Sequence, residues 1–146
     1  MKPELVIPVG IPASGKSTLS EKYWDHVPIS PDQIRREVFG VEYDKEVEAM
    51  VWEIAFELLE CYTKARANVY FDATNISKWA RAKLIKAVDR RTYNVVAHYL
   101  PCSIKTALKR NLGRSRRVPE EVIVGMAERL EEPTLDEGFK EIRVGS

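Results

Sequence analysis

The feature that most constrains this chain is a glycine-rich stretch that follows an apolar run at residues 5–9. The stretch reads Gly10-Ile-Pro-Ala-Ser-Gly-Lys16-Ser17-Thr18 and matches the pattern G-x-x-x-x-G-K-[ST] in full. The apolar run before it predicts a strand, and residues 17–23 after it predict a helix. Strand, loop and helix in this order are the context that a phosphate-binding loop requires.

The residue types of this loop explain how it would hold phosphate. The loop glycines let backbone N–H groups curl around a β-phosphate, and the amino terminus of the following helix adds partial positive charge. Lys16 is placed to reach the β- and γ-phosphates, and the Ser17 hydroxyl to bind Mg²⁺. The sequence therefore predicts a nucleoside triphosphate site. Its expected ligands are Gly10, Ala13, Ser14, Gly15, Lys16, Ser17 and Thr18.

Length and composition predict one globular domain over residues 1–146, because the chain is 45% hydrophobic and 31% charged without a low-complexity tract. No apolar stretch approaches the roughly 20 residues of a membrane span. The amino terminus leads directly into the first predicted strand, so we expect no signal peptide, no membrane contact and a cytoplasmic location. Cys61 and Cys102 lack metal-ligand spacing and are expected to be reduced thiols.

Charge is unevenly distributed along the chain. Residues 105–117 contain six basic side chains and no acid, whereas residues 42–60 contain seven acids and one lysine. This asymmetry favours one face that binds anions, with the acidic segment serving solubility.

Predicted strands alternate with predicted helices along the chain. We expect strands at 5–9, 27–30, 68–72, 94–100 and 139–144, and helices at 17–23, 31–39, 43–66, 77–91, 103–112 and 119–130. The alternation predicts an α/β fold of the P-loop NTPase type, a parallel sheet of four to five strands with helices on both faces. In such sheets the ligand binds at the carboxyl ends of the strands.

Two helices carry expectations about their faces. Along 43–66 we expect a buried stripe and, on a second side, further apolar residues that either pack in the core or leave a dimer surface. The expected stripe is Val47, Met50, Val51, Ile54, Leu58, Cys61 and Ala65, and the second side is Trp52, Phe56 and Leu59. Along 77–91 we expect Ala80, Leu84, Ala87 and Val88 to point inward and Lys78, Arg81, Lys83, Lys86 and Arg90 to point outward.

The second predicted strand is followed by Ser30-Pro31-Asp32-Gln33, a helix start in which Ser30 caps, Pro31 takes the first position and Gln33 completes a capping box. Asp32 has two readings. It is either a favourable carboxylate in the first helical turn or a general base for phosphoryl transfer to an alcohol. Arg35, one turn later, would pair with Asp32 or bind an acceptor phosphate.

The third predicted strand ends at Asp72, which would either ligate Mg²⁺ or cap the turn that follows it. In that turn Thr74 and Asn75 are either turn formers or acceptor contacts. Farther along, the segment 114–117 follows Gly113, lies between two helices and lacks acids. We interpret this segment as a basic lid whose Arg114 reaches the γ-phosphate, rather than as a solvated surface loop.

Five motifs in order resemble the kinase domain of bacteriophage polynucleotide kinase and its bacterial 5′-end-healing relatives. They read G-I-P-A-S-G-K-S-T, S-P-D-Q-I-R, F-D-A-T-N, L-K-R-N-x-x-R and V-P, and the similarity runs over residues 6–130. The resemblance implies an enzyme that uses ATP and Mg²⁺ to phosphorylate the 5′-hydroxyl end of DNA or RNA. It also leaves open a larger end-repair protein with phosphatase or ligase activities, although no D-x-D-x-T phosphatase motif is present.

The resemblance also implies roles for individual residues. Lys16 and Ser17 match the phosphate-loop lysine and the Mg²⁺-binding serine, and Asp32 matches the general base that activates the 5′-hydroxyl. Arg35 matches the arginine that holds the acceptor's 3′-phosphate, and Arg114 the lid arginine on the γ-phosphate. Thr74 stands where the family contacts acceptor nucleic acid. Pro31 is a departure, since the family often has a basic residue there.

Two other readings remain open from the sequence. Related P-loop kinases phosphorylate sugars, antibiotics, nucleotide-sugars or tRNA-linked serine with similar parts, so the acceptor could be a small molecule. The chain could also be a non-catalytic nucleotide-binding module in a repair assembly. A switch GTPase is disfavoured, because the chain has neither an N-K-x-D-like guanine motif nor D-x-x-G after the third strand.

Overall fold

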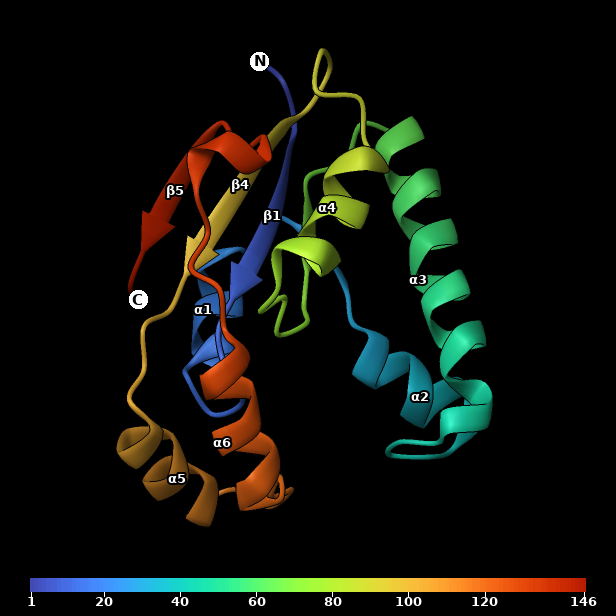
Figure 1. Ribbon diagram of the computed structural model, residues 1–146. Coiled ribbons are helices and arrows are strands. Elements are labelled where there is room, and N and C mark those ends of the chain that lie inside the picture. Colours follow the sequence, from blue (N-terminus) through green and yellow to red (C-terminus); the bar gives the residue numbers. More distant parts are fainter.

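Five parallel strands form one sheet in the order β2-β3-β1-β4-β5 in the computed structural model, which describes residues 1–146 (Figure 1). The strands are β1 Glu4–Val9, β2 Val27–Ile29, β3 Val69–Phe71, β4 Asn94–Tyr99 and β5 Glu141–Val144. The central strand β1 pairs with β4 over six residue pairs, from Glu4 opposite Asn94 to Val9 opposite Tyr99. Its last five residues are all buried, as expected for a parallel strand covered on both faces.

Six helices surround the sheet. They are α1 Lys16–Lys22, α2 Pro31–Phe39, α3 Lys45–Lys64, α4 Lys78–Lys86, α5 Ile104–Leu112 and α6 Glu120–Arg129, with one 3₁₀ turn at Leu135–Glu137. None of these helices is long and apolar enough to cross a membrane.

Alternate residues of the strands point to opposite faces of the sheet. Leu5 and Ile7 of β1 join a large core with residues of α2, α3 and α4, whereas Val6 joins a smaller cluster with Leu19 of α1. Helices therefore cover both faces, and the predicted architecture is confirmed. Helices α5 and α6 pack on each other around Ala107 and Ile123, beyond the carboxyl ends of the strands (Figure 1).

Serine side chains cap three helices, and the cap predicted at Ser30 is one of them. Ser77 and Ser103 accept hydrogen bonds from the third helical N–H of α4 and α5, at 3.0 and 3.1 Å. Ser30 does the same for α2, where its hydroxyl accepts from the N–H of Gln33 at 3.1 Å. The other half of that expected capping box is wrong, because the Gln33 amide donates instead to Glu37 at 2.9 Å. Gly40 ends α2 in the left-handed region, with φ 68°.

The expected stripe on α3 is partly wrong. The fully buried residues are Val51, Ala55 and Leu59, spaced four apart, whereas Met50 is 45% exposed and Cys61 is exposed. Helix α3 is rotated about its axis relative to the orientation expected from the sequence, because its aromatic residues pack on the sheet. The ring of Trp52 lies 6.0 Å from that of Phe71 in β3, and the ring of Phe56 lies 6.4 Å from it. The second apolar side thus belongs to the intramolecular core.

The outward orientation expected for Arg81 is wrong, since this side chain has no exposed surface. Its Nε and Nη2 donate to the two carboxylate oxygens of Glu137 at 2.8 and 3.1 Å, and Nη1 donates to the carbonyl of Asn75 at 2.9 Å. Helix α4 also ends at Lys86, five residues earlier than expected, which leaves Ala87 exposed rather than inward. Arg81 thus ties α4 to the segment before β5 and to the turn after β3.

Removing the buried guanidinium should destabilise the fold strongly. Arg81→Ala leaves the Glu137 carboxylate, which is only 8% exposed, without its partner, at a cost of about 3 kcal/mol or more in the free energy of unfolding. The matched variant Lys86→Ala on the exposed side of α4 should cost about 0.5 kcal/mol or less. Urea denaturation followed by circular dichroism measures both. Equal stability of the two variants would contradict a structural role for the Arg81 ion pair.

Candidate active site

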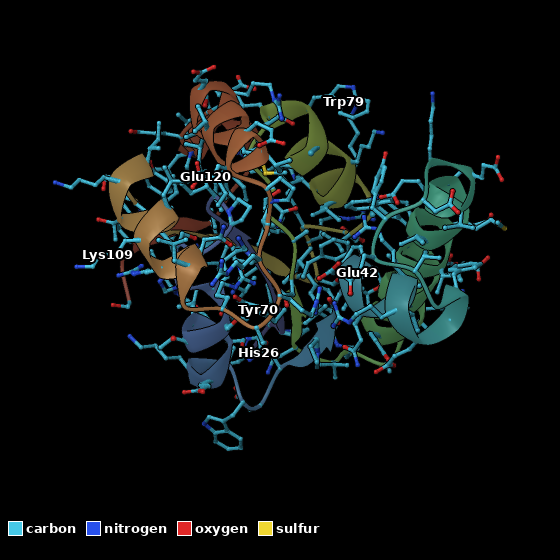
Figure 2. The ribbon with its side chains drawn as sticks, turned by 90° about the horizontal axis from the view of Figure 1, so that it is seen from below. His26, Glu42, Tyr70, Trp79, Lys109 and Glu120 are labelled. Atoms are coloured by element: carbon cyan, nitrogen blue, oxygen red, sulfur yellow. The ribbon has the colours of Figure 1, made fainter.

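A cleft of about 980 Å³ opens at the carboxyl ends of the strands. It is lined by the loop 12–18, the start of α2, the turn after β3, and the segment between α5 and α6. Figure 2 looks onto this end of the sheet: α5 with Lys109 and α6 with Glu120 lie on one side, and Glu42, before α3, lies on the other. Every sequence-predicted site residue except Gly10 lines this cleft: the loop residues 13–18 together with Asp32, Arg35, Asp72, Thr74 and Arg114.

The loop has the strained backbone that its motif predicts. Gly15 precedes α1 with φ 106°, and Ala13 also has a positive φ of 64°. At Gly10 a Cβ atom would lie 2.5 Å from the Ser14 Oγ, so any larger residue would displace that hydroxyl. Glycine leaves room for the Ser14 hydroxyl at Gly10, and at Gly15 it adopts the positive φ without steric cost.

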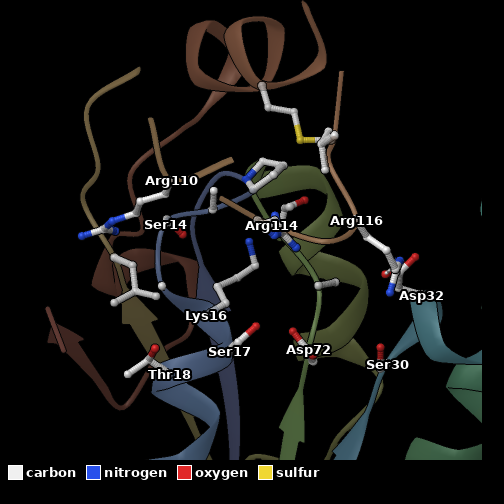
Figure 3. Close-up of a pocket in the computed structure, with 18 of the residues that line it drawn as sticks. Ser14, Lys16, Ser17, Thr18, Ser30, Asp32, Asp72, Arg110, Arg114 and Arg116 are labelled. Carbon is white, nitrogen blue, oxygen red and sulfur yellow. Dashed lines mark hydrogen bonds and ion pairs between the residues drawn. The ribbon is translucent and has the colours of Figure 1, made fainter. Parts of the chain in front are cut away.

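Lys16 projects into the cleft from the start of α1. Its ammonium donates to the carbonyls of Gly10 and Ile11, at 3.0 Å each. Burial lowers the pKa of Lys16 to about 8, with the Arg114 charge acting in the same direction and Asp72 opposing it. Figure 3 shows Lys16, Ser17, Asp72 and Arg114 around the same space. A bound anion would supply the negative counter-charge that the buried Lys16 ammonium lacks.

Other groups of the loop fit a phosphate as well. The Ser14 Oγ is the one buried side-chain N or O atom that has no hydrogen-bond partner. Arg110 reaches over the loop from α5, with Nη1 4.0 Å from the Cβ position of Gly15. An unpaired buried hydroxyl, a helix amino terminus and nearby cations are what phosphate oxygens require. The residues present therefore fit the phosphates of a nucleotide, and sequence reasoning missed Arg110 among them.

Ser17 and Asp72 are the oxygen donors that would hold Mg²⁺. Asp72 follows β3, next to β1 in the sheet, and burial raises its pKa while the Lys16 charge opposes this shift. No cluster of three or more His, Cys, Asp or Glu side chains exists for a metal. One carboxylate and one hydroxyl nevertheless fit Mg²⁺, which takes most of its ligands from nucleotide phosphates and water.

The turn after β3 is fastened to the end of β1. The N–H of Gly10 donates to the carbonyl of Thr74 at 3.0 Å, and the Asn75 amide donates to the carbonyl of Pro8 at 2.9 Å. Asn75 is buried with φ 49°, so it forms the turn. Thr74 also forms part of this turn and lies at the cleft wall, where the family resemblance implied an acceptor contact.

Asp32 lies in the first turn of α2, across the cleft from Lys16. Its Oδ2 accepts from Arg36 at 2.8 Å and from Arg116 at 3.0 Å, and its Oδ1 has a 3.5 Å contact to Arg35. Partial burial favours the neutral carboxyl, but the hydrogen bonds and charges of Arg116 and Arg36 outweigh it and lower the pKa of Asp32. The carboxylate is therefore ionised at neutral pH and can accept a proton.

Arg35 is held by a partner that sequence reasoning missed. Its Nε donates to Glu48 Oε2 at 2.9 Å and its Nη2 donates to Glu48 Oε1, which also accepts from the Trp52 indole at 3.0 Å. Glu48 belongs to the acidic segment that we interpreted as a solubility face, and this interpretation is wrong for Glu42 and Glu48. Both carboxylates pair with arginines beside the cleft.

The segment between α5 and α6 is a loop closed at its base. The buried Asn111 side chain donates to the carbonyl of Val118 at 2.7 Å and accepts from its N–H at 2.9 Å. The loop extends over the cleft, where Arg114 lies beside Lys16 and Arg116 reaches Asp32 (Figure 3). Asp32 thus contacts Arg36 and Arg116, which the sequence did not single out, in addition to the predicted partner Arg35.

Comparison with known proteins places the chain in a family. The model of the AAA_33 family, described as an AAA domain, matches residues 5–133. The chain belongs to this family of P-loop kinases. It is 31% identical over 137 residues to the L-seryl-tRNA(Sec) kinase of Methanococcus maripaludis, covering 88% of this chain and 53% of that protein.

Other relatives share the fold. The chain is 25% identical over 130 residues to a protein of Autographa californica nuclear polyhedrosis virus named for polynucleotide kinase and RNA ligase activities, covering 80% of this chain and 19% of that one. A chain of the Pnkp1/Rnl/Hen1 RNA repair complex superposes with TM-score 0.78 at 22% identity, over 88% of this chain and 44% of that one. A gluconokinase from Sinorhizobium meliloti gives TM-score 0.64 at 19% identity, over 97% and 81% of the two chains.

The pKa of Lys16 predicts how nucleotide affinity depends on pH. The charged ammonium binds phosphate, so above pH 8 binding must first protonate Lys16, and ATP affinity should fall about tenfold per pH unit. Calorimetric titration with Mg·ATP from neutral to alkaline pH measures this. Lys16→Met should bind weakly without that pH dependence, and the exposed control Lys22→Ala should behave like wild type. A flat wild-type profile would contradict the lowered pKa.

Proposed function

We propose that the chain is the kinase domain of an ATP-dependent polynucleotide 5′-hydroxyl kinase. The observation that carries this proposal is the position of Asp32. Its ionised carboxylate lines the same cleft as the phosphate loop, and three arginines surround it. A carboxylate that can take up a proton, next to several cations, suits a substrate that carries both a hydroxyl group and phosphates.

The residues divide the reaction between them. Lys16 and Arg114 would neutralise the charge that develops on the transferred γ-phosphoryl group, and Ser17 and Asp72 would hold Mg²⁺. The 5′-oxygen of the acceptor bonds to the γ-phosphorus while the bond to the β–γ bridging oxygen breaks, and ADP leaves. Asp32 takes the proton of the acceptor hydroxyl and returns it to solvent. Oδ1, which has only the 3.5 Å contact to Arg35, is the oxygen open to that hydroxyl.

The comparisons support a nucleic-acid acceptor. The tRNA kinase and the viral protein named above both carry names that refer to RNA or polynucleotide substrates. A similar chain occurs in an RNA repair complex together with other components. We include in the proposal an association with ligase or phosphatase activities, because the name of the viral protein joins polynucleotide kinase with RNA ligase and a similar chain occurs in an RNA repair complex. This chain spans 53% and 19% of the two curated relatives.

A second acceptor is favoured by one observation, the 31% identity to L-seryl-tRNA(Sec) kinase over most of this chain. In that reading the same Asp32 would deprotonate the hydroxyl of a serine esterified to tRNA. The two acceptors differ in what carries the hydroxyl, a ribose at a strand end or an amino acid. A panel of acceptors separates them.

The test is transfer of labelled γ-phosphate from Mg·ATP to a 5′-OH oligonucleotide, its 5′-phosphorylated twin, seryl-tRNA and small alcohols including gluconate. We expect label on the 5′-OH oligonucleotide and not on its twin. Asp32→Asn should lower kcat about 100-fold or more, because the proton acceptor is lost. Asp89→Asn, which changes an exposed carboxylate far along the chain, should keep the wild-type rate.

Label on seryl-tRNA or gluconate alone would reject the polynucleotide acceptor. Full activity of Asp32→Asn on every labelled acceptor would reject Asp32 as the base. Bound ATP without transfer to any acceptor would favour the nucleotide-binding module.

A further inference from the structure

Helix α4 presents one aromatic and two basic side chains to solvent, outside the cleft. They are Trp79, Lys83 and Lys86, at positions i, i+4 and i+7, so they lie on one side of the helix. All three are exposed, and Trp79 is 72% exposed. Figure 2 shows Trp79 at the outer edge of the molecule. We call these three residues the α4 stripe.

The cations of the α4 stripe have no acidic partner. Neither Lys83 nor Lys86 takes part in an ion pair. Helix α4 contains no Asp or Glu, and Asp89, the next acid along the chain, pairs with Arg91. The stripe therefore carries uncompensated positive charge, which suits a polyanion.

The indole of Trp79 gives this surface a second chemical property. The Nζ of Lys83 lies 3.5 Å from the centroid of the ring, a cation–π contact that covers one face of the indole. Because most of the side chain is exposed, the other face of the ring is open to solvent. Proteins that hold single-stranded nucleic acid combine these two elements, an aromatic ring on which a base stacks and cations along the backbone phosphates.

The helix that carries the stripe is fixed in place from its buried side. Arg81 donates to Glu137 and to the carbonyl of Asn75, and the N–H of Lys78 donates to Glu131 at 3.1 Å. A rigid helix presents its side chains without an ordering cost for the backbone. The turn after β3, which forms part of the cleft wall, leads directly into α4.

We propose that the α4 stripe binds a single-stranded segment of nucleic acid outside the cleft, with a base stacked on Trp79 and backbone phosphates on Lys83 and Lys86. Trp79 and Lys86 are two helical turns apart, about 10 Å, which is the length of about three stacked nucleotides. The proposal rests on the proposed function and deepens it, because this surface would hold the body of the strand whose end enters the cleft. Strands that reach both places should bind more tightly than mononucleotides.

A membrane surface fits the stripe less well than nucleic acid. Trp79 is the only large apolar side chain exposed on α4, whereas binding in a membrane interface requires a continuous apolar face. A single ring between cations is sufficient for one stacked base.

Two substitutions test the proposal, with binding measured by fluorescence anisotropy of a single strand of about 15 nucleotides labelled at its 3′ end. Trp79→Ala should weaken binding about tenfold, within the range of one base–aromatic contact. Lys86→Ala should reduce the slope of log affinity against log salt by about 0.7, because one phosphate contact is lost. Circular dichroism checks that both variants, which change exposed side chains, remain folded.

Trp24 and Lys22 provide matched controls at the end of α1, on the opposite face of the sheet. Both are exposed, Trp24 at 84%. Trp24→Ala and Lys22→Ala should bind the oligonucleotide like wild type, with the wild-type salt slope. Polyglutamate of equal total charge is the control ligand, and it should compete poorly because it has no base to stack.

Equal binding by wild type and Trp79→Ala, an unchanged salt slope in Lys86→Ala, or no binding by wild type would each overturn the proposal. Competition by polyglutamate as strong as that by unlabelled oligonucleotide would overturn it in favour of an acidic protein partner. Because binding is measured without turnover, the result is separate from the acceptor panel. Trp79-dependent binding in a protein that labels no oligonucleotide would sustain the α4 stripe and reject the polynucleotide kinase. Labelling with the same KM in wild type and Trp79→Ala would do the reverse.

Discussion

The candidate active site depends on the attachment of the turn after β3 to the end of β1. The Gly10 N–H to Thr74 carbonyl bond and the Asn75 amide to Pro8 carbonyl bond join two strand ends that the sheet places side by side. The buried Arg81 supports this turn from behind through the Asn75 carbonyl. These contacts hold Asp72 opposite Lys16 and Ser17, which the phosphate loop alone cannot achieve.

The positive charges at the two ends of the cleft are balanced in different ways. On the nucleotide side Lys16 and Arg114 are close enough that the Arg114 charge helps to lower the pKa of Lys16, and Ser14 keeps an unpaired hydroxyl. That side is incomplete without an anion. On the other side each arginine has a carboxylate partner. In the proposed function a nucleotide would fill a site that is short of negative charge, whereas an acceptor would meet arginines that already have carboxylate partners.

Local signals explain what could be predicted from the sequence. The phosphate loop and the helix start capped by Ser30 depend on neighbours within a few residues, and the structure has both. Partners far apart in sequence could not be predicted. Arg81 meets Glu137 across 56 residues and Arg116 meets Asp32 across 84. Charged residues at helical spacing look solvent-exposed until the fold brings their partners to them.

The structure also bears on the two readings of Asp32. Asp32 lies in the first turn of α2, where a carboxylate is favourable, while the Ser30 hydroxyl caps the helix by accepting from Gln33. The oxygens of Asp32 go instead to three arginine side chains, two of which it shares with the carboxylates of Glu48 and Glu42. The first-turn position and the proposed role as proton acceptor are therefore compatible, because the carboxylate also lines the cleft. The presence of three arginines around Asp32 is explained if these arginines also contact the acceptor in the proposed reaction.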